Sequence, residues 1–274
     1  MEPQHDVVQR VPVAGAGPAA KKAGTEFLWG VRILGRGFGM YAKSPRLLLL
    51  GMIPAVIALL VVAAALIVLW IFTGDLASWV TPFADEWSDG VRRTLRAIVA
   101  VAIVLASVTI AALTYTALTL LIGDPFYEVI SERVEDRLGG TPGALDLPWY
   151  KTFRRNLIDS LRLIGLGIAV SIPLFALGFV PVVGQTVVPV IDAIIGGWLL
   201  AVELTGIPFN RRGLYLTQRR QMLRANRPLA LGFGIPVFLL LLIPFAAILV
   251  VPAAVAGSTL LARRVLGQSI ESKV

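Results

Sequence analysis

The sequence contains no cysteine and only one histidine, His5. Without cysteine the chain cannot form a disulfide, a thiolate zinc site, an iron–sulfur cluster or a cysteine nucleophile. His5 lies in a Pro-, Gly- and Ala-rich segment, so a histidine general base or metal cluster is not expected. A glycine-rich phosphate loop, a nucleophile elbow and a pair of catalytic carboxylates are also missing. We therefore expect no catalytic residue, metal site or cofactor, and the chain is not predicted to be an enzyme.

Charged residues are scarce, at 15% of the 274 residues, whereas 57% are apolar. Soluble domains have about 25% charged residues. The apolar residues form four long stretches, and about 20 apolar residues suffice for one helix to cross a bilayer. The first two stretches fit one helix each, but the last two are longer and contain prolines. This pattern predicts an all-α integral membrane protein, with its stretches at about 47–73, 97–122, 163–205 and 229–262.

The first two stretches predict two long transmembrane helices. The first should begin after Pro45 and contain a kink at Pro54. The second should end at Gly123, where Asp124 can cap a further, amphipathic helix. The apolar stripe of that helix is formed by Phe126, Ile130, Val134 and Leu138, with its charges on the opposite face. Residues 26–42 predict another amphipathic cytoplasmic helix, lying on the membrane surface or packed as a cap on the bundle.

The last two stretches predict proline-broken helical hairpins. One breaks at a turn from Pro181 to Pro189, and the other breaks near Pro244 and Pro252. Their arms are short, so each hairpin either crosses the bilayer or enters and leaves on the same side. The sequence leaves both alternatives open.

Lysine and arginine alternate between abundant and scarce along the loops. Seven precede the first stretch, six follow the second and six follow the third; only three separate the first from the second, and the hairpin turns have none. Cytoplasmic loops are the basic ones, which predicts that both termini are cytoplasmic. The net charge of +8 is then topogenic, so no nucleic-acid partner is expected. Residues 1–26 lack the apolar core of a signal peptide. They predict a flexible tail. The first membrane helix is then expected to serve as the insertion signal.

Two acidic residues, Asp192 and Glu203, lie well inside the apolar stretches. Carboxylates inside a membrane indicate functional sites. Asp192 can alternatively cap a helix at the hairpin tip, and Glu203 can pair with Arg211, Arg212 or another loop arginine. Backbone N–H groups at the tip could attract an anion, at Gly184, Gln185 and Thr186. A basic cluster could gather anions or anionic lipid, or only set the topology; it comprises Arg211, Arg212, Arg219, Arg220, Arg224 and Arg227.

Four motifs occur in a fixed order: Asp124-Pro125-Phe126, the segment 180–189, Gly206-Ile207-Pro208-Phe209-Asn210, and the segment 252–259. Together they resemble the CysZ sulfate permease and etoposide-induced-protein superfamily. The resemblance covers about residues 27–265, which would form the membrane domain between the tail 1–26 and a short cytoplasmic tail 266–274. The motif residues are Asp124, Pro125, Phe126, Pro181, Pro189, Pro208 and Phe209.

The resemblance implies a homo-oligomeric protein of the bacterial inner membrane, with two full spans and two hemi-penetrating hairpins, that takes up sulfate for cysteine synthesis. Sulfate-handling relatives carry a Gly-Leu-Arg motif just before the first span. This chain lacks the motif and reads Lys43-Ser44-Pro45-Arg46-Leu47-Leu48-Leu49 there. Counted back from Pro54, the motif arginine corresponds to about Leu48, so Arg46, two residues away and assisted by Lys43, is expected to take its place in holding the anion. The alternative is a non-transporting scaffold or lipid-interacting protein, which would have dry hairpin tips and tolerate substitution of Asp192.

Overall fold

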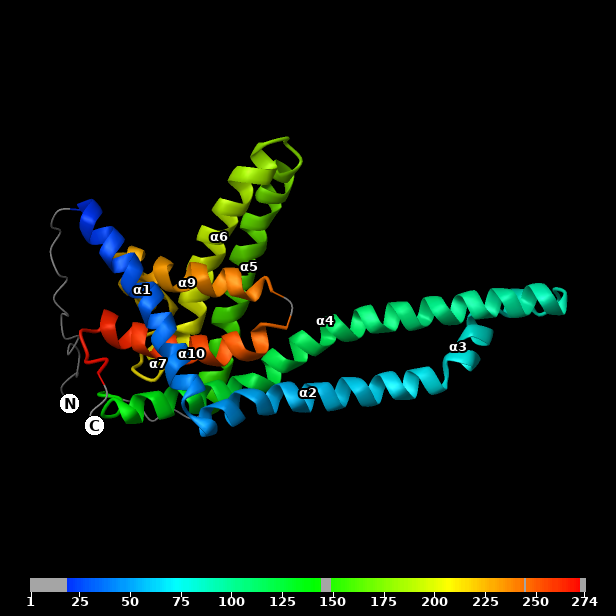
Figure 1. Ribbon diagram of the computed structural model, residues 1–274, viewed down its shortest axis with the longest axis horizontal. Coiled ribbons are helices and arrows are strands. Elements are labelled where there is room, and N and C mark those ends of the chain that lie inside the picture. The colour runs from blue at the N-terminus through cyan, green and yellow to red at the C-terminus, as the bar shows by residue number, and fades with distance from the viewer. Residues whose placement is uncertain (1–18, 144–148, 244, 272–274) are drawn as a thin grey trace, which may run out of the picture. The chain divides into compact units, whose positions relative to one another are not determined.

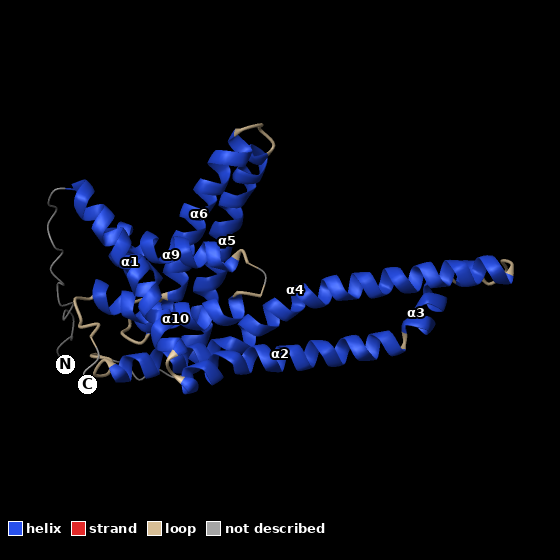
Figure 2. Ribbon diagram, viewed as in Figure 1, coloured by secondary structure: helices blue, strands red, loops and turns tan. Residues whose placement is uncertain are grey.

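The computed structural model describes residues 19–143, 149–243 and 245–271, and every regular element in these ranges is a helix (Figure 2). The predicted all-α class is therefore confirmed. Figure 1 labels most of the helices, which are α1 (Ala19–Ala42), α2 (Pro45–Ile71), α3 (Thr73–Val80), the 3₁₀ turn η1 (Pro82–Ala84), α4 (Asp89–Arg137), α5 (Trp149–Gly178), α6 (Val183–Leu204), α7 (Gly206–Asn210), α8 (Leu216–Ala225), α9 (Arg227–Leu241) and α10 (Ala247–Val265).

Among the described residues, five helical segments are long and apolar enough to cross a membrane. The protein is therefore a multi-pass membrane protein. α9 is apolar but has only 15 residues. The five segments are Pro45–Ile71, Asp89–Arg137, Leu157–Gly178, Val183–Asn210 and Ala247–Val265.

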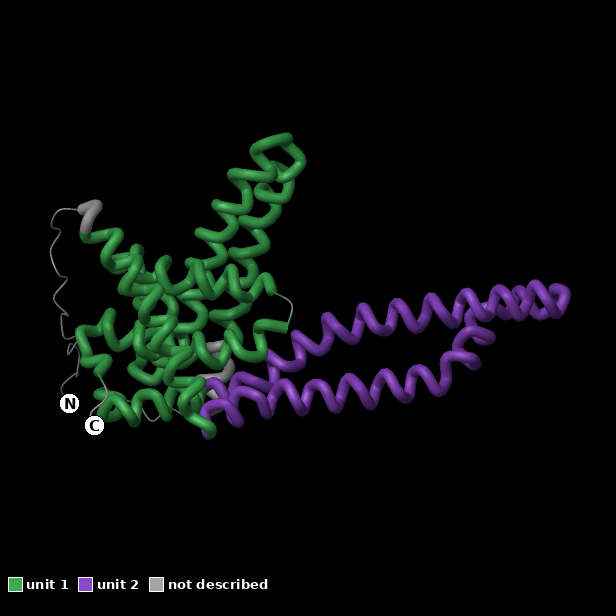
Figure 3. Tube along the Cα trace, in the orientation of Figure 1, with its two compact units in different colours: residues 1–45, 128–274 green, residues 46–127 purple. Residues whose placement is uncertain are grey.

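The chain divides into two compact units, residues 46–127 and the described parts of 1–45 and 128–274 (Figure 3). The unit 46–127 is a helical hairpin made by α2, α3 and most of α4. Its large apolar side chains are widely exposed, for example Leu60 at 65% and Leu113 at 72%. Such a surface is stable in lipid, where every backbone group is paired within its helix. Pro54 lies inside α2, as predicted.

α4 runs without interruption from Asp89 to Arg137, so the predicted helix end at Gly123 and new start at Asp124 are wrong. Pro125 lies inside the helix. Proline is tolerated in a membrane helix, where it removes one backbone donor while breaking the helix would leave several groups unpaired. Gly123 packs directly against the ring of Tyr127, one turn later. Of the predicted apolar stripe beyond this point, Ile130, Val134 and Leu138 are buried and Phe126 is half-buried. The charged face predicted opposite is wrong at Glu135, which is fully buried.

α10 forms the core of the other unit. All fourteen residues from Val250 to Arg263 are buried. α1 and α9 both pack on α10, α6 packs on α9, and α5 packs on α6 (Figure 1). Two close backbone contacts join α1 to α9: a Cβ on Gly30 would overlap the carbonyl oxygen of Leu229, and a Cβ on Gly232 would overlap that of Phe27. Small residues allow membrane helices to approach in this way.

α1 is a packed helix of this unit, with Ile33, Leu34 and Tyr41 buried. The packed cap expected for residues 26–42 is therefore observed. The outward face of α1 is exposed, and its position on the membrane surface stays a prediction. α1 begins at Ala19, within the stretch 1–26 predicted as a flexible tail. Residues 1–18 of that stretch lie outside the described residues.

Both predicted hairpins are present, but their breaks are shorter than expected. α5 ends at Gly178 and α6 begins at Val183, so the predicted turn from Pro181 to Pro189 is wrong in its second half. Pro189 continues inside α6, for the reason given for Pro125. α9 ends at Leu241 and α10 begins at Ala247, with Pro252 inside α10. Pro244 lies outside the described residues.

Candidate functional site

The predicted anion-binding residues flank the start of α2. Lys43 lies in the turn after α1, and Arg46 lies in the first turn of α2. Both side chains are exposed, and neither forms a hydrogen bond or ion pair with the described residues. Ser44 between them is buried and its hydroxyl oxygen accepts a hydrogen bond of 2.7 Å from Nη2 of Arg137. Lys43 and Arg46 thus present two exposed positive charges at the start of α2, without an ion-pair partner among the described residues.

The predicted tip residues Gly184, Gln185 and Thr186 belong to the first turn of α6 rather than to a free turn. The tip already uses several of its own donors. The Gly184 N–H donates to the Val180 carbonyl at 2.8 Å, and the Thr186 N–H and hydroxyl both donate to the Val182 carbonyl. An anion at this tip would therefore meet fewer open N–H groups than a bare helix N-terminus offers.

Asp192 is exposed on α6 and lines a cavity of 420 Å³ in the α5–α6 hairpin. Ser171 is the other polar residue of this cavity, and the remainder is apolar: Leu174, Phe175, Gly178, Phe179 and Val188. An exposed carboxylate on an otherwise apolar hairpin is costly in lipid unless it finds a partner.

Glu203 is half-buried near the end of α6 and accepts a hydrogen bond of 2.5 Å from the Ser160 hydroxyl of α5. The arginines expected as its partners bind elsewhere. Arg211 lies 3.6 Å from Glu132, and Arg212 lies 2.8 Å from Glu135.

Arg219 is a buried arginine of α8 whose charge interacts with that of Glu203. Only 1% of Arg219 is exposed. Its guanidinium occupies the space that a side chain on Gly206 would fill. Burial lowers the pKa of Arg219, the carboxylates of Glu203 and Asp159 oppose that shift, and Arg220 adds to it. Its Nε and Nη2 donate no hydrogen bond to the described residues. The charge of Arg219 in α8 thus interacts with those of Glu203 in α6 and Asp159 in α5.

A second buried cluster surrounds Glu135, near the end of α4. Its carboxylate is fully buried and pairs with Arg212 at 2.8 Å and with Arg263 of α10. Arg263 also donates to the carbonyls of Leu138 and Gly140, which follow α4. The sequence did not predict this cluster, because Glu135 belongs to the face of the helix predicted to be solvated. Its partner Arg263 lies 128 residues further along the chain. The sequence offers one signal for this cluster: Arg263 directly follows the long apolar stretch 229–262.

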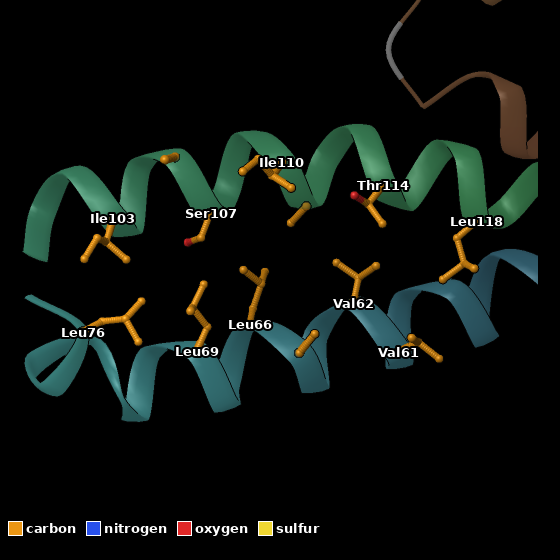
Figure 4. A pocket seen from close by; sticks show the side chains of 13 residues that line it. Val61, Val62, Leu66, Leu69, Leu76, Ile103, Ser107, Ile110, Thr114 and Leu118 are labelled. Carbon is orange, nitrogen blue, oxygen red and sulfur yellow. The ribbon is translucent and has the colours of Figure 1, made fainter. Parts of the chain in front are cut away.

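The hairpin of unit 46–127 holds a cavity of 440 Å³ between α2 and α4 (Figure 4). One hydrogen bond joins the two helices: Nε1 of Trp70 in α2 donates to the hydroxyl oxygen of Ser107 in α4 at 3.2 Å. Among the lining side chains only Ser107 and Thr114 carry a hydroxyl, and the others are apolar. Such a lining fits a hydrocarbon chain and offers a hydrated anion few donors.

Comparison with known families matches residues 33–252 to the family described as sulfate transporter CysZ/etoposide-induced protein 2.4. The chain belongs to this family. All seven predicted motif residues fall inside the matched segment. Pro208 and Phe209 in α7 are buried, and the Pro208 carbonyl accepts a hydrogen bond of 2.9 Å from Arg212. In this CysZ-family chain, that motif therefore supports the buried cluster around Glu135.

The curated relatives named sulfate transporter CysZ include the following three. The protein of one Pseudomonas fluorescens strain is 34% identical over 143 residues, covering 51% of this chain and 57% of that protein. The Pectobacterium atrosepticum protein is 31% identical over 140 residues, covering 50% and 51%. A Vibrio cholerae protein is 30% identical over 140 residues, covering 50% and 56%. The chain thus spans about half the length of the curated relatives it matches.

Proposed function

We propose that this protein is a permease that moves sulfate or a related small oxyanion across the bacterial inner membrane, supplying sulfur assimilation. The observation that carries the proposal is membership of the CysZ family, with relatives named as sulfate transporters over half of the chain. The transport pathway needs no covalent chemistry from the protein. Its task is to replace water around a doubly charged anion with fixed donors.

Arg46, assisted by Lys43, attracts the anion at the cytoplasmic mouth. One feature supports these residues: both charges are exposed without a partner among the described residues. Arg46 would substitute, from two residues away, for the arginine of the Gly-Leu-Arg motif, which would correspond to about Leu48 in this chain. Gly184, Gln185 and Thr186 form a weaker site at the α5–α6 tip. Asp192 and Glu203 act as structural or coupling carboxylates, Glu203 through its contact with Ser160.

Both termini lie on the cytoplasmic side, and the protein works as a homo-oligomer surrounded by lipid. The alternation of basic and uncharged loops supports this orientation. Exposed Asp192 supports an assembly, because a second copy could cover a carboxylate that lipid would not solvate.

Uptake of radiolabelled sulfate into proteoliposomes tests the proposal. Wild type should show saturable uptake, and Arg46→Ala should lower its initial rate about tenfold, as expected when one charge-assisted hydrogen bond is lost. Arg93→Ala is the matched control, since Arg93 is an exposed arginine of α4 outside the proposed site. It should transport like wild type. No uptake above empty vesicles, from folded protein, would favour the non-transporting scaffold instead.

A further inference from the structure

Three guanidinium groups surround the indole ring of Trp29 on the outward side of α1. The guanidinium carbons of Arg32, Arg36 and Arg264 lie 5.7, 5.6 and 4.5 Å from the ring centroid. Trp29, Arg32 and Arg36 share one stripe of α1, since residues spaced by three and seven lie on one helix face. Arg264 reaches the same ring from the last turn of α10, which packs on α1.

Positive charge is in excess at this cluster. Arg32 and Arg36 are exposed and form no hydrogen bond or ion pair with the part of the chain that the structure describes. Arg264 pairs with Glu26 at 3.3 Å, which leaves one carboxylate for three guanidiniums. The ring face attracts each cation, but it does not remove their mutual repulsion. An anion with several oxygens would do so, and it would match the planar fork of donors that each arginine presents.

The surroundings of the cluster favour a lipid headgroup over a free anion. On the exposed side of α1, Leu28 lies one turn before Arg32 and Val31 lies three residues after Leu28. They are 58% and 37% exposed. Tryptophan concentrates at membrane interfaces, and basic side chains on an amphipathic helix bind anionic headgroups. Lys22 continues the stripe seven residues before Trp29 and is also exposed.

We propose that Trp29, Arg32, Arg36 and Arg264 form a binding site for the phosphate of an anionic phospholipid, with the acyl chains against Leu28 and Val31. The site is separate from the proposed transport site at Arg46. It would fix α1, and through α1 the α10 core, to an anionic membrane surface.

Fluorescence quenching by brominated lipids tests this site in the intact protein. Subtracting the signal of Trp29→Phe from that of each Trp29-containing protein isolates the quenching of Trp29. Brominated phosphatidylglycerol, added to a phosphatidylcholine background, should quench Trp29 more strongly than brominated phosphatidylcholine. Each arginine charge removed should weaken this preference about fivefold, so Arg32→Gln/Arg36→Gln should abolish it.

Two variants separate a lipid site from a loss of structure. Arg32→Lys/Arg36→Lys keeps both charges and should keep most of the preference, and Arg93→Gln should leave it unchanged. Equal quenching by the two lipids, or none by either, would overturn the proposal. Loss of the preference when sulfate replaces chloride at equal ionic strength would also overturn it, because the cluster would then bind a free oxyanion. The result does not depend on transport, so failure of either proposal leaves the other standing.

Discussion

Glu135 is the residue on which three distant parts of one unit converge. Its carboxylate holds Arg212, from the segment between α7 and α8, and Arg263 from α10, and all three side chains are at most 5% exposed. A buried ion pair contributes little net free energy when intact, but removing one partner leaves an uncompensated charge in a medium of low polarity. Two buried guanidiniums depend here on one carboxylate.

Glu135→Gln should therefore destabilise the protein by about 3–5 kcal/mol. The midpoint of thermal unfolding in detergent measures this loss. Glu132→Gln is the control: Glu132 lies on the same helix, its side chain is 55% exposed and it contacts Arg211 at 3.6 Å, so its loss should cost at most about 1 kcal/mol. Similar shifts for the two variants would mean that the buried cluster does not stabilise the unit.

At the scale of the element, the α5–α6 hairpin closes through a strained turn. Val182 has φ 68° and ψ −51°, and the Val183 N–H donates to the Pro181 carbonyl at 2.8 Å. This is a γ-turn with positive φ, which is rare and unfavourable for a β-branched residue. Gly184 follows, and a Cβ there would overlap the carbonyl oxygen of Gly178.

Substitutions at Val182 and Gly184 should change the stability of the protein in opposite directions. Val182→Gly removes the strain and should raise stability by about 1 kcal/mol, because the valine side chain is 71% exposed and little packing is lost. Gly184→Ala should lower stability, since the added methyl group forces the tip open. Thermal unfolding of both variants checks this pair, and a loss of stability in Val182→Gly would contradict the strained turn.

The sequence predicts the elements that depend on residues close together in the chain. It does not predict contacts between residues far apart in the chain. Long apolar runs are local signals, and they predicted α2, the membrane part of α4 and both hairpins. Prolines are local signals too, but their meaning depends on the solvent: Pro125 and Pro189 lie inside helices because lipid cannot satisfy a broken helix. For the candidate site, the anion-binding role of Lys43 and Arg46 stays a prediction, to which the structure adds only that both side chains are exposed. The burial of Glu135 and Arg219 could not be predicted, because it depends on partners far away in the sequence.

At the scale of the whole molecule, helix length distinguishes the two hairpins. At 1.5 Å per residue, α5 with 30 residues and α6 with 22 extend about 45 and 33 Å. α9 with 15 residues extends about 22 Å, which is less than the hydrocarbon core of about 30 Å. Both arms of the α5–α6 hairpin are long enough to cross, whereas the α9 arm of the α9–α10 hairpin is not. The α9–α10 tip should therefore stop inside the bilayer.

Single cysteines can locate these tips, because the chain has no other thiol. A membrane-impermeant maleimide added to intact cells should label Glu86→Cys in the loop before α4 and Val182→Cys at the α5–α6 tip. It should label Arg224→Cys, an exposed residue of α8, only after permeabilisation. Leu242→Cys at the α9–α10 tip is 65% exposed in the protein alone, yet lipid should shield it in both conditions. Fast external labelling of Leu242→Cys would mean that this hairpin also crosses, and external labelling of Arg224→Cys would invert the orientation that the loop charges predict.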